Sequence, residues 1–271
     1  MEIKITSKND PIVSIKELVS YRELFYLLAL RDIKVRYKQT LLGVFWVVFQ
    51  PLILTIIFTV FFNRVANITT GAFPYILFSF SGLVFWNFFS SALNDISNSL
   101  ITNQSLVTKV YFPRLIIPVS TIIVGLIDFF ISFAFILPII FIFKVKVDLI
   151  NILILIPSLL LLIIFLLGLG LFLSMLNAKF RDVRYVLPFF IQLLLFITPI
   201  IYPVGLVSQN LRWFLYLNPI TGTVEMIRVY FLKFGTLNIN YLLISLSVAI
   251  IFLIFGFVYF KQGEARIADV I

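Results

Sequence analysis

A basic segment gives way to an uncharged one between Arg31 and Phe62, where the sequence reads RDIKVRYKQTLLGVFWVVFQPLILTIIFTVFF. Residues 31–38 contain four Lys and Arg side chains, whereas residues 43–62 contain no ionisable side chain. Twenty helical residues extend about 30 Å, which is the thickness of the hydrocarbon core of a bilayer. Lys and Arg beside a span favour the cytoplasmic side, because translocating them is costly and the inner leaflet is anionic. The stretch therefore predicts a membrane-spanning helix whose N-terminal end faces the cytoplasm.

The composition of the whole chain is typical of a membrane protein. Of its 271 residues, 62% are hydrophobic and 12% are charged, whereas soluble domains contain roughly 25% charged residues. We therefore expect a single all-α, polytopic membrane domain over residues 1–271. The chain has no Cys and no His, so we expect no disulfide and no metal or cofactor bound to it. Its net charge of +9 is not gathered into a tract that would predict a nucleic-acid partner.

Apolar runs separated by polar segments predict six transmembrane helices. The third run is longer than a straight span requires and contains Pro118 and Pro138, so we expect it to tilt, kink or extend beyond the bilayer. The fourth run contains Gly168 and Gly170, which favour close helix packing. The predicted spans are residues 43–62, 75–93, 115–143, 149–176, 186–202 and 241–260.

The distribution of Lys and Arg predicts the orientation of these spans. With both termini in the cytoplasm, 15 of the 21 Lys and Arg lie in inner segments and six lie in outer ones. This bias favours an N-in, C-in topology. We expect the chain to cross the membrane several times, in contact with membrane lipid.

Two polar regions carry helical patterns outside the spans. We expect residues 1–13 to be disordered and residues 14–38 to form an amphipathic interfacial helix, because Ser14 and Glu17 form a capping box. A helix packed on a protein partner is the alternative for that segment. Residues 204–232 are too polar to span, and Asn218-Pro219 predicts an N-cap and first-turn Pro within them. We expect two short outer helices there that dip back toward the membrane.

Several classes of chemistry find little support in the residues. The phosphate-binding pattern GxxxxGK[ST] is missing, so the energy for any active process must come from a partner or a gradient. Asp128 is the one acid inside a predicted span. Such a carboxylate is a functional candidate, and the alternative is a structural residue that is protonated or paired with an amide.

Aromatic residues recur at helical spacing in the first and fifth predicted spans. Most of the 32 Phe residues are expected to face lipid or to pack between helices. A wall of rings would also suit a long, uncharged, repetitive polymer better than an ion. The candidate channel-lining residues are Phe45, Trp46, Phe49, Phe189, Phe190 and Phe196.

Charged residues give two further candidate sites. Arg31, Lys34 and Lys38 share one helical face, where they would either anchor the topology or contact the pyrophosphate of a lipid-linked substrate. Glu225 and Arg228 are three residues apart on the second outer helix. They would either pair to hold an outer gate or form a solvated pair worth about 0.3 kcal/mol.

The order of several motifs resembles the permeases of type-2 ABC exporters, particularly those for O-antigen, teichoic acid and related surface polysaccharides. The resemblance covers nearly the whole chain from about residue 20. The matching stretches are RDIKVRYKQTLLG at 31–43 with Trp46 and Gln50-Pro51, KVYFPR at 109–114, FRDVRY at 180–185, PIIYP at 199–203, LNP at 217–219 and the tail at 264–271. Lys261, just before that tail, and Ile267, within it, replace the Arg and the aromatic residue expected of the family.

The resemblance implies a homodimer bound to two copies of a separate ATP-binding subunit, which would hold ATP and Mg²⁺. It also implies that residues 94–114 form a cytoplasmic coupling loop, with Asn98, Asn103 and Lys109 touching the ATPase. The first and fifth spans would line a channel, and residues 204–232 would form its outer gate. The implied cargo is an undecaprenyl-linked glycan such as O-antigen, moved from the cytoplasm to the outer face of the membrane. The resemblance also implies that this membrane is the cytoplasmic membrane of a bacterium or archaeon.

Three other functions remain open on the sequence alone. A drug or small-lipid exporter of the same class would need a compact pocket in place of a continuous channel. A membrane enzyme that acts on lipid-linked sugars would need clustered acids or arginines in a large outer loop, and the longest outer segment holds only Glu225, Arg212, Arg228 and Lys233. A passive channel would need no ATP-hydrolysing partner.

Overall fold

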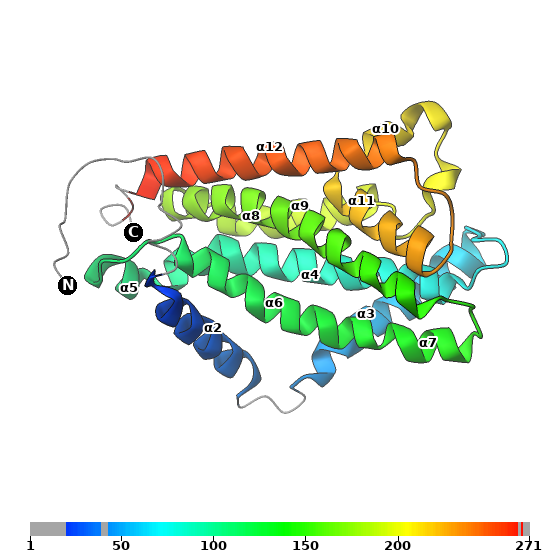
Figure 1. Ribbon diagram of the computed structural model, residues 1–271, viewed down its shortest axis with the longest axis horizontal. Helices are drawn as coiled ribbons and strands as arrows, with labels where there is room; N and C mark the ends of the chain where they lie inside the picture. Colours follow the sequence, from blue (N-terminus) through cyan, green and yellow to red (C-terminus); the bar gives the residue numbers. More distant parts are fainter. Residues whose placement is uncertain (1–19, 39–42, 265–266, 268–271) are drawn as a thin grey trace.

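The computed structural model describes residues 20–38, 43–264 and 267, and every regular element within them is a helix. Most of these helices run along the long axis of the molecule, while one N-terminal helix crosses obliquely at one end (Figure 1). The all-α class is therefore confirmed. The predicted disordered tail and the predicted helix start at Ser14 lie outside the described residues, as does most of the C-terminal tail.

The long helices coincide with the predicted spans. Five helical rods are long and apolar enough to cross a membrane, and the apolar helix Val183–Ile197 is shorter. The rods are α3 (Phe45–Phe58) with η1 (Thr59–Val65), α4 (Tyr75–Thr102), α6 (Ile116–Ala134) with α7 (Ile136–Ile142), η2 (Leu149–Ile154) with α8 (Leu155–Lys179), and α12 (Ile239–Glu264). The remaining elements are α2 (Arg22–Tyr37), α5 (Gln104–Lys109), α9 (Val183–Ile197), η3 (Val204–Leu206), η4 (Gln209–Leu211), α10 (Arg212–Leu215), α11 (Pro219–Met226) and η5 (Ile227–Phe231).

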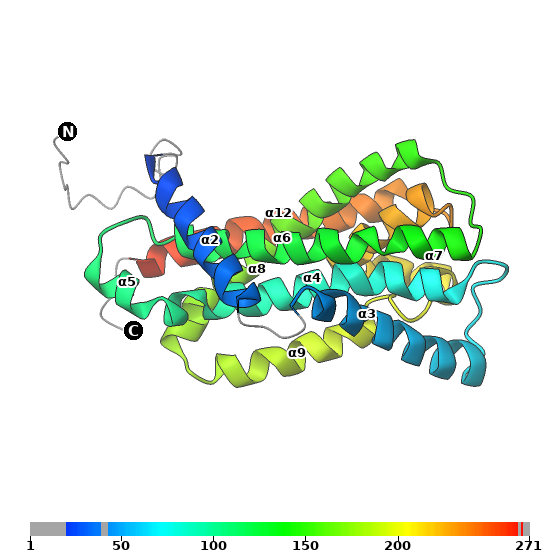
Figure 2. The ribbon, with the colours of Figure 1, turned by 90° about the horizontal axis from the view of Figure 1, so that it is seen from below.

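Helix α4 forms the core of the molecule. It packs against α3, α6, α8, α9 and α11, and its membrane segment is buried over 78% of its residues. Residues 77–86 are all buried, so every side of this part of α4 is covered, as expected of a helix surrounded by other helices. Figure 2 shows α4 between α6 on one side and α9 and α3 on the other.

Helix α4 also continues nine residues beyond the predicted end of the second span. Asn94, Asn98 and Thr102 each bond the backbone carbonyl four residues earlier, at distances of 2.8, 2.8 and 3.0 Å. Polar side chains that bond their own helix in this way need no loop conformation. The polarity of residues 94–102 therefore does not mark the end of the helix, and only α5 follows before residue 110.

Prolines account for a break in the third span and for the end of α9. The third span breaks at Phe135 between α6 and α7, because Pro138 has no N–H to donate to the turn before it. Helix α9 ends at Ile197, earlier than the predicted span end at residue 202. Thr198 has the extended ψ of 134° that the following Pro199 imposes.

Helices α8 and α12 approach each other closely through two glycines. A methyl group added at Gly168 would lie 2.3 Å from the backbone N of Leu253, and one at Gly256 would lie 1.9 Å from the carbonyl of Gly168. Gly170 instead faces the side chain of Ile96 on α4, 2.7 Å from the position of an added methyl. The close packing predicted for the fourth span is therefore confirmed.

The segment between α9 and α12 gathers at the end of the molecule opposite α5 (Figure 1). Asn218 accepts a hydrogen bond from the N–H of Ile220 at 3.1 Å, and Pro219 is the first residue of α11. The predicted N-cap is therefore confirmed. Every residue of α11 is buried, so this helix packs within the protein and does not lie on its surface.

Candidate functional site

The predicted channel-lining rings lie on α3 and α9, two helices that pack on α4 and run along the same side of the molecule (Figure 2). Phe45, Trp46, Phe189, Phe190 and Phe196 are exposed, and Phe49 is half-buried. Such exposed rings in a membrane subunit face lipid, a second subunit or a lumen. The two helices thus present an uncovered aromatic surface, as a channel wall between two copies would require.

These rings also contact one another within each helix. Phe49 stacks on Phe45 with ring centroids 5.0 Å apart and meets the edge of Trp46 at 5.4 Å. Phe189 and Phe190 contact edge to face at 6.1 Å. Offset and edge contacts hold rings in place, so the surface is ordered and not a set of independent side chains.

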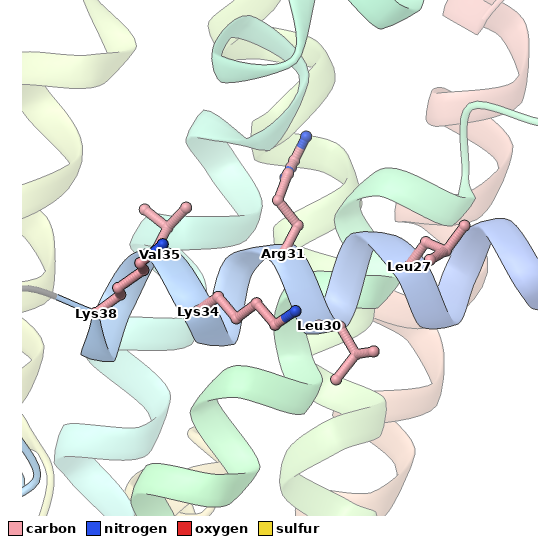
Figure 3. Close-up of a pocket in the computed structure, with 6 residues that line it drawn as sticks. All are labelled: Leu27, Leu30, Arg31, Lys34, Val35 and Lys38. Carbon is pink, nitrogen blue, oxygen red and sulfur yellow. The ribbon is translucent and has the colours of Figure 1, made fainter.

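The predicted basic face lies on α2 and borders a shallow groove of about 580 Å³ lined by Leu27, Leu30, Arg31, Lys34, Val35 and Lys38 (Figure 3). Arg31 and Lys38 are exposed, as is Lys34. Arg31 donates to Asp32 at 2.9 and 2.7 Å, and its side chain points away from that of Lys34 (Figure 3). The three charges therefore share a face but do not converge on one point, and Asp32 partly neutralises Arg31.

Arg36, which lies off that face, forms an ion-pair cluster that sequence reasoning missed. Its guanidinium contacts Asp95 at 3.3 Å, Asp128 at 3.2 Å and the Ser91 hydroxyl at 2.9 Å. Tyr37 donates its hydroxyl to Asp128; burial, together with this bond and the negative charge of Asp128, raises the pKa of Tyr37. The cluster joins the end of α2 to α4 and α6.

The cluster also explains Asp128, the one acid found inside a predicted span. It is paired with Arg36 and bonded to Tyr37, so it has the partners of a structural residue, but these are a guanidinium and a phenol and not the predicted amide. An intramembrane carboxylate needs a partner, and a search for a basic residue near the membrane flank could have suggested Arg36. The sequence could not single it out from Arg31, Lys34 and Lys38.

The three residues predicted to touch an ATPase differ in accessibility. Asn103 is buried and donates to the Ser99 carbonyl at 2.8 Å. Asn98 is half-buried and accepts a 3.1 Å hydrogen bond from Asn177 on α8. Lys109, in the last turn of α5, is exposed. Of the three, only Lys109 therefore offers its side chain to a partner, while the two amides hold α4 and its end together.

Glu225 and Arg228 form a buried ion pair at the opposite end of the molecule. Their side chains are 6% and 0% exposed and lie 3.2 Å apart, so the alternative of a solvated pair is wrong. Arg228 also donates to the carbonyls of Pro199, Ile200 and Phe78. The pair thus connects η5 with α4 and with the chain that follows α9.

Comparisons with known proteins agree with this architecture. The family model described as "ABC-2 type transporter" matches residues 23–232. The chain is similar to two proteins of Klebsiella pneumoniae named "O-antigen export system permease protein RfbA", at 29% identity over 96% of this chain and 100% of the relative, and at 28% over 92% and 95%. A protein of the same name from Myxococcus xanthus is 25% identical over 94% of this chain and 98% of its own length.

Proposed function

Because the chain belongs to the ABC-2 type transporter family, as a multi-pass membrane permease, we propose that it is the membrane subunit of an ATP-driven exporter of a lipid-linked polysaccharide. The observation that carries this proposal is the similarity to three permeases named for O-antigen export, which extends over 92–96% of the chain. The cargo would be an undecaprenyl-linked glycan that passes from the cytoplasm to the outer face of the membrane.

The energy for export would come from two copies of a separate ATP-binding subunit that hold ATP and Mg²⁺. The missing phosphate-binding loop in this chain supports that division. The contact surface would lie at the end of the molecule formed by α5, where Lys109 is exposed. The basic residues around this end support its placement in the cytoplasm.

The channel would form between two copies of the chain, with α3 and α9 as its walls. Both helices carry exposed rings on the same side of the molecule (Figure 2). Rings can stack against sugar faces without binding any one sugar tightly, which suits a long polymer. Helix α9 would be the fifth span in chain order, in addition to the five long rods; its 15 residues extend about 22 Å, and the buried segment after Ile197 would complete the crossing.

The basic groove on α2 would receive the pyrophosphate of the substrate at the inner membrane face. Lys34 and Lys38 lie there beside the apolar side chains of Leu27 and Leu30. An ammonium group and an apolar surface together suit a lipid phosphate. Reversing the charge of Lys34 and Lys38 tests this role, and unchanged export with normal membrane insertion would contradict it.

Replacement of rings on the proposed wall tests the channel. Phe189→Ala and Phe190→Ala should lower the export of glycan by cells that lack the unaltered gene, whereas Phe141→Ala should not. Phe141 is the matched control because it is 85% exposed but lies on α7. Equal loss in all three variants, at equal protein levels, would contradict a specific role for α9.

A small-molecule exporter of the same family is the second candidate, because membership of the ABC-2 type family does not by itself define the size of the cargo. Deletion of the gene distinguishes the two. Accumulation of undecaprenyl-linked glycan inside the cell is expected for the proposed function. Normal surface glycan together with sensitivity to a drug would favour the alternative.

A further inference from the structure

Non-helical backbone is buried directly after α9. Residues Thr198, Pro199, Ile200 and Ile201 are all buried, although the helix ends at Ile197. Backbone outside regular structure is tolerated in an apolar environment only where its polar groups find partners. The carbonyls of these four residues must therefore be satisfied by other parts of the protein.

Each of the four carbonyls has a partner. The carbonyl of Thr198 accepts from the N–H of Ile200 at 2.7 Å, and that of Ile201 accepts from the Tyr75 hydroxyl at 2.7 Å. The carbonyls of Pro199 and Ile200 both accept from Arg228, at 2.5 and 3.1 Å. Half of the backbone acceptors in this segment thus depend on one guanidinium.

Arg228 is itself held against α4. It donates to the carbonyl of Phe78 at 3.0 Å, and its guanidinium carbon lies 3.6 Å from the centroid of the Phe78 ring. One turn along α4, a methyl group added at Gly82 would lie 2.7 Å from Arg228 Nη2. Phe78 therefore contacts the guanidinium, and the absence of a side chain at Gly82 leaves room for it against α4. Glu225 neutralises its charge.

Helix α9 itself packs against the protein with fewer buried residues than the segment that follows it. Only Leu187 and Ile191 are buried along its 15 residues. The helix is therefore lightly packed over most of its length and tightly bonded just beyond its C-terminal end. A helix with this distribution of contacts moves most easily at its N-terminal end.

We propose that Arg228 is the positioning residue for the outer end of α9. Its guanidinium fixes residues 198–201 to α4 and η5, so that this end of α9 is a fixed point. The anchoring itself does not depend on the transport function. Its consequence for a channel does rest on the proposed function: the wall formed by α9 would swing at the end near α5 while its outer end stays in place.

Cysteine labelling tests the anchor, because the chain has no Cys of its own. The full chain in lipid nanodiscs would carry Ile201→Cys, at a position that is 3% exposed, and would be treated with a maleimide. We expect slow labelling with Arg228 present and about tenfold faster labelling with Arg228→Met, because two buried hydrogen bonds that close the segment are lost. Unchanged labelling would overturn the proposal.

Two control positions separate local release from general unfolding. Leu206→Cys, at a position 61% exposed, should label quickly whether or not Arg228 is replaced. Leu171→Cys, at a position 2% exposed on α8, should label slowly in both cases. Faster labelling at Leu171→Cys in the Arg228→Met chain would mean that the whole fold is loosened and would overturn a local positioning role.

A double variant separates positioning from charge balance. Arg228→Met with Glu225→Gln leaves no unpaired buried charge, so the thermal unfolding midpoint should recover toward that of the unaltered chain. Labelling at Ile201→Cys should nevertheless remain fast, because the carbonyls of Pro199 and Ile200 still lack a donor. Recovery of both would overturn the proposal, since Arg228 would then act only by neutralising Glu225.

Gly82→Ala provides an independent disturbance of the same contact. The added methyl would lie 2.7 Å from Arg228 Nη2 and 3.2 Å from Ile200 Cγ2, so it would push the guanidinium and the segment apart without removing Arg228, and should speed labelling at Ile201→Cys. Gly205→Ala is the matched control, because no atom lies within 4 Å of its added methyl. Labelling does not require export, so a failure of the proposed function would leave this result intact.

Discussion

Two arginine–carboxylate clusters join helices in different parts of the molecule and differ in burial. At the end opposite α5, Arg228 and Glu225 are 0% and 6% exposed. In the cluster that joins α2 to α4 and α6, Arg36 is 33% exposed and its partners Asp95 and Asp128 are 41% and 16% exposed. Both clusters join elements that are distant in sequence, but only the first is closed to solvent.

The difference in burial determines what each cluster can do. A buried guanidinium has no water to replace a lost partner, so its contacts form together or break together. A half-exposed one can exchange a carboxylate for water at small cost. The Arg228 cluster is therefore suited to a fixed point, and the Arg36 cluster is suited to a contact that adjusts while α2 stays attached to α4 and α6.

The largest expected effect comes from removing the buried charge. Arg228→Met should lower the free energy of unfolding by about 3–5 kcal/mol, because Glu225 is left buried without a partner. Denaturant unfolding of the solubilised chain measures this loss. A loss below about 1 kcal/mol is in the range of exposed pairs. It would mean that water reaches the Arg228 cluster and that the two clusters do not differ in burial.

A smaller loss is expected at the half-exposed cluster. Arg36→Met should cost about 1–3 kcal/mol, since Asp95 and Asp128 lose a charged hydrogen-bond donor but are less enclosed than Glu225, with side chains 41% and 16% exposed. The same unfolding measurement applies, with the exposed Arg22 replaced by Met as the control. A cost equal to that of Arg228→Met would remove the distinction between the clusters.

The two carboxylates around Arg36 should contribute unequally. A double-mutant cycle with Arg36→Met should give a coupling of about 1 kcal/mol for Asp128→Asn and a few tenths for Asp95→Asn. The reason is that Asp128 is less exposed and also bonds Tyr37. The reverse order would show that exposure does not determine the strength of these contacts.

The smallest effect is expected at an ion pair on the surface. Lys233 and Asp148 lie 2.6 Å apart with side chains 48% and 59% exposed. Lys233→Met should change the free energy of unfolding by less than about 1 kcal/mol, and the change should shrink at high salt. Parallel measurements at low and high ionic strength check this. A large, salt-independent loss would contradict the ordering of all three sites by burial.

The sequence predicted the helices better than their ends. The N-cap at Asn218 was confirmed because it depends on local chemistry, and the close packing at Gly168 was confirmed because a residue without a side chain allows a neighbouring helix to approach. The continuation of α4 to Thr102 was missed because amide side chains that bond their own helix have the same polarity as a loop. The burial of Asn103 was missed for a related reason, since its amide bonds inside the helix end.

The candidate sites show the same division. Composition and spacing identified Glu225 and Arg228 as a pair and Asp128 as an acid in need of a partner. They did not reveal that Arg228 bonds carbonyls 28, 29 and 150 residues away, or that Arg36 reaches Asp128. Such contacts depend on how helices meet, and no pattern within one helix records them.

The sequence by itself determined that this protein is an all-α membrane protein, because a span needs a fixed length of uncharged helix and flanking charges. Only the tertiary structure decided which charges are buried and which helix forms the core. Burial of a polar group requires partners from several segments at once, and those segments become neighbours only when the chain has folded.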